Sequence, residues 1–237
     1  MLPELERHHE VLAPTLAGHA GGPPLVGAVS GDVIPDAIER AMDDAGLATA
    51  HIVGNSLGGY VALQLAARGR AESVVALAPA GGWADGDDSL NETLDFFATM
   101  HEQLKIAAPQ AAAIVATAEG RRRATQFITT SFEHIPAELL AHQILGAAKC
   151  DTVPLIECAR REGYSLDAEK ITCPVRIVWG TDDKLLQWPS AAARFRNDWL
   201  PHADWVELDA VGHCPQLDIP LETAQLIVGF TAGERRG

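Results

Sequence analysis

Short apolar runs alternate along this chain with longer segments of helical periodicity. Residues 50–54, "AHIVG", are apolar and β-branched, as expected of a strand buried on both faces. Similar runs, each followed by a loop, lie at 9–14, 73–82, 173–180 and 203–212. This alternation predicts βαβ units and a mainly parallel sheet with flanking helices, an α/β fold.

Three segments between and after these runs have helical periodicity. Residues 34–46 predict a helix with Pro35 in its first turn and Gly46 at its end. An amphipathic helix is expected over 57–69, directly after the strand at 50–54. A last helix is expected over 218–233.

The stretch 85–170 departs from the strand–helix alternation. It opens polar, with Ser89 or Asn91 as a candidate helix cap. Its periodicity then predicts helices over 91–107, 109–130, 136–148 and 153–162. We expect residues 85–170 to be a helical insertion over one end of the sheet, here called the cap, and residues 1–84 and 171–237 to form the core.

Composition narrows the class of partner. The chain has 237 residues, a hydrophobic fraction of 47% and a formal net charge of −14. Such acidity argues against nucleic acid or an anionic membrane surface as the main partner. No apolar run is long enough to span a membrane, and the N-terminal residues lack the apolar region of a signal peptide. With four cysteines outside any CxxC pair and no metal-ligand spacing of histidines, we expect a cytoplasmic protein without a metal.

One motif carries chemistry. "GNSLG", Gly54 to Gly58, fits G-x-S-x-G, the nucleophile elbow, in which a serine stands on a sharp strand-to-helix turn. The glycines avoid clashes between the turn and the incoming helix. A purely structural turn is the alternative. The predicted strand before Ser56 and helix after it favour the elbow.

An unassisted serine hydroxyl is a poor nucleophile and needs a base, usually a histidine oriented by a carboxylate. Asp182 and Asp183 follow the predicted strand at 173–180, and His213 follows the one at 203–212. In a parallel sheet these loops lie at the same edge as the elbow, the edge where open α/β sheets bind ligands. Serine, carboxylate and imidazole therefore converge on one edge.

These residues resemble the α/β-hydrolase superfamily over nearly the whole chain. The resemblance rests on four segments: "APTLAGHAG", "VGNSLGG", "WGTDD" and "VGHCPQLDIP". The resemblance implies the α/β-hydrolase fold with a helical cap, which corresponds to residues 85–170. It also implies that the reaction needs no cofactor or metal. The family's acid, three residues past the glycine of the "WG" turn, corresponds to Asp183, with Asp182 as the alternative, and its histidine corresponds to His213.

The resemblance implies a serine hydrolase that works by two-step acyl transfer on a small-molecule carboxylic ester. The backbone N–H of Leu57 would be one donor to the oxyanion. Carbon–carbon hydrolysis of a diketone-like acid is the alternative reaction. A binding protein with little or no catalysis is the alternative class. The oligomeric state stays open.

The resemblance fails at the N-terminus. Residues 4–21 match the family's fourth strand and its following loop, so three strands, one helix and the His-Gly segment that gives the second oxyanion donor have no counterpart. Lacking that donor alone would lower the rate by roughly 10²–10³. The chain is either an N-terminally shortened form, for instance from a start codon assigned too late, or a natural variant whose fourth and fifth strands pair directly. The complete triad favours the first.

Several side chains have a structural and a functional interpretation. Seven in or beside the cap are expected to pack helices together or to line an acyl pocket: Trp83, Phe96, Phe97, Met100, Phe127, Phe132 and Tyr164. Arg121, Arg122 and Arg123 are expected to form a solvated helix face, with a substrate carboxylate as the alternative ligand. Cys214 is expected to be a packing residue. Asn55, directly before Ser56, does not discriminate between ester hydrolysis and carbon–carbon hydrolysis.

Overall fold

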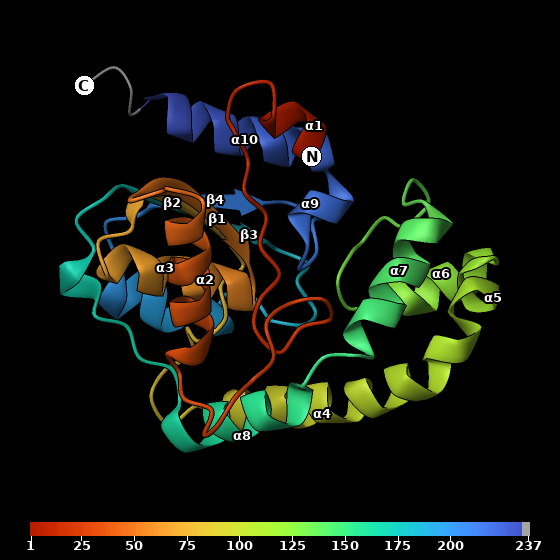
Figure 1. The fold of residues 1–237 in the computed structure, drawn as a ribbon. Helices are drawn as coiled ribbons and strands as arrows, with labels where there is room; N and C mark the ends of the chain where they lie inside the picture. The colour runs from red at the N-terminus through yellow and green to blue at the C-terminus, as the bar shows by residue number, and fades with distance from the viewer. Residues whose placement is uncertain (234–237) are drawn as a thin grey trace.

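The computed structural model describes residues 1–233 and contains, within them, a four-stranded parallel sheet (Figure 1). The strands are β1 (Ala50–Asn55), β2 (Ala71–Leu77), β3 (Val175–Gly180) and β4 (Asp204–Leu208). They lie in the order β1-β2-β3-β4, and each neighbouring pair is parallel. The carboxyl ends of all four strands therefore lie at one edge of the sheet.

Helices cover both faces of the sheet. They are α1 (Leu2–Leu5), α2 (Val33–Asp44), α3 (Leu57–Ala67), α9 (Pro215–Asp218) and α10 (Pro220–Gly233). Val74 and Ala76 of β2 pack in one cluster with α3, and their neighbours Val75 and Leu77 pack on the other face against α1 and α10. This alternation makes β2 a strand buried on both faces, as its sequence predicts.

The helix after the elbow differs from its prediction. We expected an amphipathic helix, but α3 lies between the sheet and α2 and is buried on both sides. Leu63 of α3 belongs to the cluster with β2, whereas Val61 and Leu65 pack against Ile34 and Ile38 of α2. A helix between two packed layers has no solvent-facing stripe, so the apolar residues continue around it.

The cap residues form helices beside the sheet (Figure 1). They are α4 (Ser89–Ala107), α5 (Ala111–Val115), α6 (Ala118–Thr125), α7 (Ala137–Ala147) and α8 (Thr152–Glu162). The single helix predicted over 109–130 is wrong. Thr117 is extended, and its hydroxyl accepts the Gly120 amide at 3.0 Å, so a new helix starts there.

The strand predicted over 9–14 is also wrong. Those residues are irregular, and no backbone hydrogen bond joins residues 10–14 to β1 in the described chain. Instead Val11 packs with the apolar cluster of α1 and α10. β1 is thus an edge strand. Its residues are half-buried, so the prediction that this strand is buried on both faces is wrong, and the direct pairing that we considered for a natural variant does not occur.

None of the described helices combines the length and the hydropathy needed to cross a bilayer.

Candidate active site

Ser56 stands at the turn between β1 and α3. Its backbone angles are φ 57° and ψ −120°, a conformation that a non-glycine residue adopts only when its surroundings impose it. Its amide donates to the Leu77 carbonyl at 2.9 Å, and its carbonyl accepts the amides of Tyr60 and Ala80 at 3.1 and 3.0 Å. These three bonds fix the corner that the sequence predicts.

Two glycines make room for this corner. A Cβ at Gly54 would lie 2.0 Å from the Gly58 carbonyl oxygen, and one at Gly59 would lie 3.1 Å from Pro79. Gly58 is different, because a Cβ there would meet nothing within 4 Å. The clash that we expected of the motif's glycines therefore applies to Gly54 and not to Gly58.

His213 and Asp183 form a buried pair at the same sheet edge. Nδ1 of His213 lies 2.7 Å from Oδ2 of Asp183, and the two residues are 2% and 4% exposed. A carboxylate only accepts, so Nδ1 carries the proton and Nε2 of the neutral ring is left as the basic nitrogen.

The second carboxylate oxygen of Asp183 holds the loop after β3. Oδ1 accepts the amides of Leu185 and Leu186 at 2.9 and 2.7 Å. Asp182, the alternative acid, is exposed, and its backbone amide donates to the Val211 carbonyl at 3.0 Å. The structure thus brings Asp183, and not Asp182, to His213.

Ser56 and His213 are not hydrogen-bonded to each other. Nε2 of His213 is buried and has no partner among residues 1–233. An unpaired buried nitrogen is costly, and it is the atom that would take a proton from a serine hydroxyl. Catalytic hydrogen bonds are often long before substrate binds.

Asn55, which told us little from the sequence, links the elbow to the histidine loop. Its side-chain amide donates to the carbonyls of Leu77 and His213, each at 3.0 Å. Its oxygen accepts from Gln216 at 3.0 Å and from the Cys214 thiol at 3.3 Å. The residue before the nucleophile therefore positions the residue predicted as base.

Asp218 ties the histidine loop to the cap, and the sequence analysis missed it. The buried carboxylate accepts the Gly212 amide at 2.7 Å through Oδ2, and the amides of Thr130 and Ser131 at 2.9 Å through Oδ1. Nothing in the local pattern marks this residue, since two of its three partners, Thr130 and Ser131, lie over 80 residues away along the chain in the cap.

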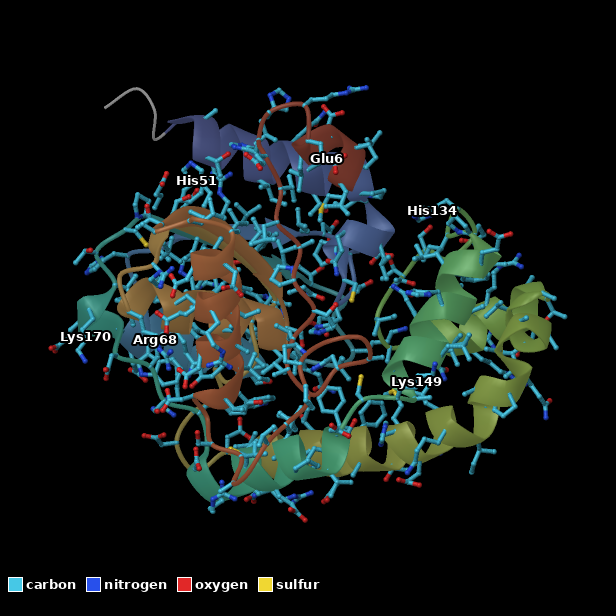
Figure 2. All side chains as sticks on the ribbon, viewed as in Figure 1. Glu6, His51, Arg68, His134, Lys149 and Lys170 are labelled. Atoms are coloured by element: carbon cyan, nitrogen blue, oxygen red, sulfur yellow. The ribbon has the colours of Figure 1, made fainter. Side chains whose placement is uncertain are left out.

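Further bonds reinforce this junction. The Cys214 amide donates to the Ile128 carbonyl at 2.8 Å, and the Thr130 hydroxyl donates to the Ala210 carbonyl at 2.8 Å. At the end of the cap nearest α9, Nε2 of His134 lies 2.6 Å from the Leu217 carbonyl (Figure 2). Residues 128–131, the cap strap, are thus bonded to the loop that carries His213.

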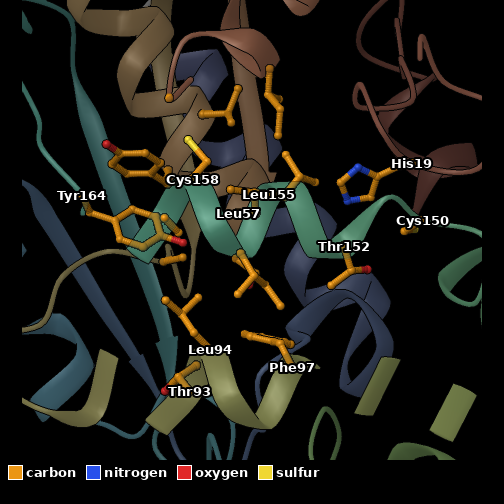
Figure 3. Close-up of a pocket in the computed structure, with 18 of the residues that line it drawn as sticks. His19, Leu57, Thr93, Leu94, Phe97, Cys150, Thr152, Leu155, Cys158 and Tyr164 are labelled. Atoms are coloured by element: carbon orange, nitrogen blue, oxygen red, sulfur yellow. The ribbon is translucent and has the colours of Figure 1, made fainter. Parts of the chain in front are cut away.

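A cavity of about 430 Å³ lies between the core and the cap, with Ser56 in its wall. Figure 3 shows α4 and α8 on its cap side, with Leu94 and Phe97 extending from α4 toward Leu155 of α8. Leu57, the first residue of α3, also lines it, and a helix's first amides have no acceptor within the helix. The cavity therefore joins an apolar chamber to the elbow.

The aromatic side chains divide between the two expected roles. Trp83, Phe97, Met100 and Tyr164 line the cavity. The others pack helices: Phe96 and Phe127 have ring centroids 4.9 Å apart, and Phe132 joins the apolar cluster of α5 and α7.

The remaining candidates have structural roles. Arg122 and Arg123 pair with Glu119 on an exposed face of α6, and Arg121 donates to the Val115 carbonyl. Burial, with the negative charges of Asp183 and Asp218 adding to it, raises the pKa of Cys214 to about 12. A thiol with that pKa stays protonated at neutral pH and is a poor nucleophile.

No group of three or more histidine, cysteine or carboxylate side chains within residues 1–233 is arranged to hold a metal ion.

Two curated relatives match most of the chain. Epoxide hydrolase EphH of Mycobacterium tuberculosis is 33% identical, over 85% of this chain and 95% of that protein. Pimeloyl-[acyl-carrier protein] methyl ester esterase of Aromatoleum aromaticum is 30% identical, over 98% of this chain and 92% of that protein.

The fold matches solved hydrolases as well. The 2-hydroxy-6-oxo-6-phenylhexa-2,4-dienoate hydrolase BphD of Rhodococcus sp. strain RHA1 superposes with a TM-score of 0.72 at 20% identity, covering 100% of this chain and 83% of that one. The sequence profile of the alpha/beta hydrolase family matches residues 1–226. The chain belongs to the alpha/beta hydrolase family, as the resemblance of its motifs predicted.

Proposed function

We propose that this protein hydrolyses carboxylic esters of small apolar acids, with Ser56 as nucleophile, His213 as base and Asp183 as the residue that orients His213. The observation that supports this most directly is the buried Asp183–His213 bond of 2.7 Å, at the same sheet edge as the elbow serine. The apolar cavity beside Ser56 is a suitable site for the acyl group.

In the proposed mechanism, His213 takes the hydroxyl proton as Ser56 attacks the ester carbonyl. The Leu57 amide, at the positive end of α3, donates to the oxyanion. The alcohol leaves with the proton from His213, and water, activated by the same nitrogen, then hydrolyses the acyl-enzyme.

The nucleophile favours ester over epoxide hydrolysis. Attack of a serine on an epoxide would leave an alkyl ether on Ser56, which water does not readily cleave, so the enzyme would not turn over. An acyl-enzyme ester is cleaved in the second step. Of the two relatives, the one named as an ester esterase therefore offers the closer chemistry.

The finer predictions from the sequence belong to this proposal. They are a small-molecule substrate, no cofactor, a cytoplasmic location and the division into core and cap. Carbon–carbon hydrolysis of a diketone-like acid is the alternative reaction on the same triad, with a carbon leaving group in place of the alcohol.

The test is intact-mass analysis after treatment with a fluorophosphonate probe. We expect one adduct on the protein and none on Ser56→Ala, whereas Ser30→Ala, which changes another serine of the cavity wall, should label normally. Circular dichroism and gel filtration confirm that each variant is folded. No adduct on folded protein would overturn the serine mechanism and favour the binding protein.

A substrate panel then identifies the reaction. p-Nitrophenyl esters, an epoxide and a diketone acid are compared, and Ser56→Ala should lower ester hydrolysis by at least about 10⁴-fold. Faster cleavage of the diketone acid than of every ester would replace ester hydrolysis by carbon–carbon hydrolysis.

A further inference from the structure

His101 is a polar residue on an apolar face of the cap. Six residues of α4 line the cavity at helical spacing: Thr93, Leu94, Phe97, Met100, His101 and Leu104. Four of the six are large and apolar, as expected of a helix face turned toward an acyl chamber. A histidine at this place needs an explanation, because leucine or phenylalanine would pack equally well.

The His101 imidazole has no hydrogen-bond partner within residues 1–233. The residue is 9% exposed, and its Nε2 is buried and unpaired. Nδ1 is not among the fully buried unpaired atoms and forms no hydrogen bond to a described residue, so Nδ1 is the nitrogen open to a molecule in the cavity. A neutral imidazole has one donor and one acceptor, and leaving either unpaired in a buried place costs roughly 1–3 kcal/mol.

The other imidazole and one of the phenols at the cavity wall already have partners. Nδ1 of His19 lies 3.2 Å from the Ala17 carbonyl, and the Tyr60 hydroxyl donates to the Ser165 carbonyl at 2.5 Å. His101 thus differs from these two rings in having its hydrogen-bonding capacity left over for a molecule in the cavity.

We infer that His101 is a specificity-determining residue that hydrogen-bonds an oxygen on the acyl chain, away from the ester. The substrate class is an ester of an oxo- or hydroxy-substituted apolar acid. The oxygen is uncharged, because the lining around His101 on α4 is apolar and would penalise a carboxylate. This inference rests on the proposed ester hydrolysis.

The test uses p-nitrophenyl esters of one chain length, in which a single oxo group is moved one carbon at a time. We expect kcat/KM of the protein to peak at one position, roughly tenfold above the unsubstituted ester, which corresponds to one good hydrogen bond. In His101→Leu the peak should disappear while the unsubstituted ester is hydrolysed as well as before or better. His101→Gln, which keeps a donor and an acceptor, should restore part of the peak.

The outcomes separate this inference from the proposed function. If no ester is hydrolysed and Ser56 is not labelled, the proposed function fails. If esters are hydrolysed but His101→Leu keeps the peak, or the protein shows none, the inference about His101 is overturned. Tyr164→Phe is the control, since Tyr164 also lines the cavity; a peak lost only in that variant would assign the contact to Tyr164.

Discussion

Ser56 and His213 lie at the same edge of one sheet, but different kinds of contact hold them. The space for the corner at Ser56 comes from its own neighbours in sequence, because a Cβ at Gly54 would meet the Gly58 carbonyl oxygen. The His213 loop is held by residues far away in sequence: Asn55, Asp183 and, through Asp218, the cap strap.

The two regions therefore differ in whether a local sequence pattern can predict them. The steric requirement at Ser56 involves residues within a five-residue segment, so it appears in the sequence as a motif. A hydrogen bond across more than 80 residues, such as that between Asp218 and Thr130, produces no recognisable sequence motif, because its two residues stand alone in distant parts of the chain. The following variants test the two kinds of support, beginning with the largest expected effect.

Asp183→Asn should lower kcat by about 10³–10⁴-fold, because an amide cannot both accept from Nδ1 of His213 and stabilise the charged ring. Asp182→Asn is the matched control and should retain activity, since that side chain is exposed. Steady-state kinetics with one ester decide between them. Equal losses in both variants would contradict the assignment of the acid.

Gly54→Ala should destabilise the protein by about 3 kcal/mol or more and abolish labelling of Ser56. The new Cβ would lie 2.0 Å from a backbone oxygen, so the turn itself must shift. Gly58→Ala is the control: it meets open space within a helix and should change stability by no more than about 1 kcal/mol, in the stabilising direction. Urea unfolding measures both, and a stable Gly54→Ala would refute the steric account.

Asp218→Asn tests the long-range support. An amide group cannot accept all three N–H groups, so we expect a loss of about 2–3 kcal/mol and labelling of Ser56 slowed by at least about tenfold. Thr130→Val removes one neutral bond of the same junction and should cost about 1 kcal/mol. A variant that is destabilised but labels at the normal rate would give Asp218 a purely structural role.

Cys214→Ala should have the smallest effect on activity, and the effect that its pKa predicts for stability appears at alkaline pH. Because the folded-state pKa of about 12 lies above the unfolded one, the thiol's contribution is complete below about pH 8.5 and is lost as pH rises toward 12. Between pH 8.5 and 10 the protein should lose about 1 kcal/mol relative to Cys214→Ala. The free energy of unfolding of both proteins is measured with urea at each pH. An equal change with pH in the two proteins would contradict the raised pKa of Cys214.

The sequence predicted the parts of the fold that repeat or that sterics dictate. β1, α3 and the elbow follow from an apolar run, three glycines and a serine, and the chain order placed Asp183 and His213 on the same edge. It failed at 9–14, where an apolar run lacks a neighbouring strand to pair with. It failed at Thr117, where one side-chain cap ends a long periodic segment.

Asp218 and His101 could not be identified from the pattern for a common reason. Each is one polar residue whose role depends on what lies opposite in space: three amides for Asp218, and no hydrogen-bond partner within residues 1–233 for the imidazole of His101. A buried carboxylate with three partners and a buried imidazole with none look alike in sequence.

The cap strap also bears on how this protein can be engineered. The Thr130 and Ser131 bonds to Asp218 come from backbone amides, so a relative's cap in place of residues 85–170 would keep them only if its backbone placed two N–H groups at the same point; otherwise the buried carboxylate would keep the Gly212 amide alone. A chimera that changes the chamber should therefore retain residues 128–131 of this chain. The rest of residues 85–170 can then be redesigned without changing the contacts that hold the His213 loop.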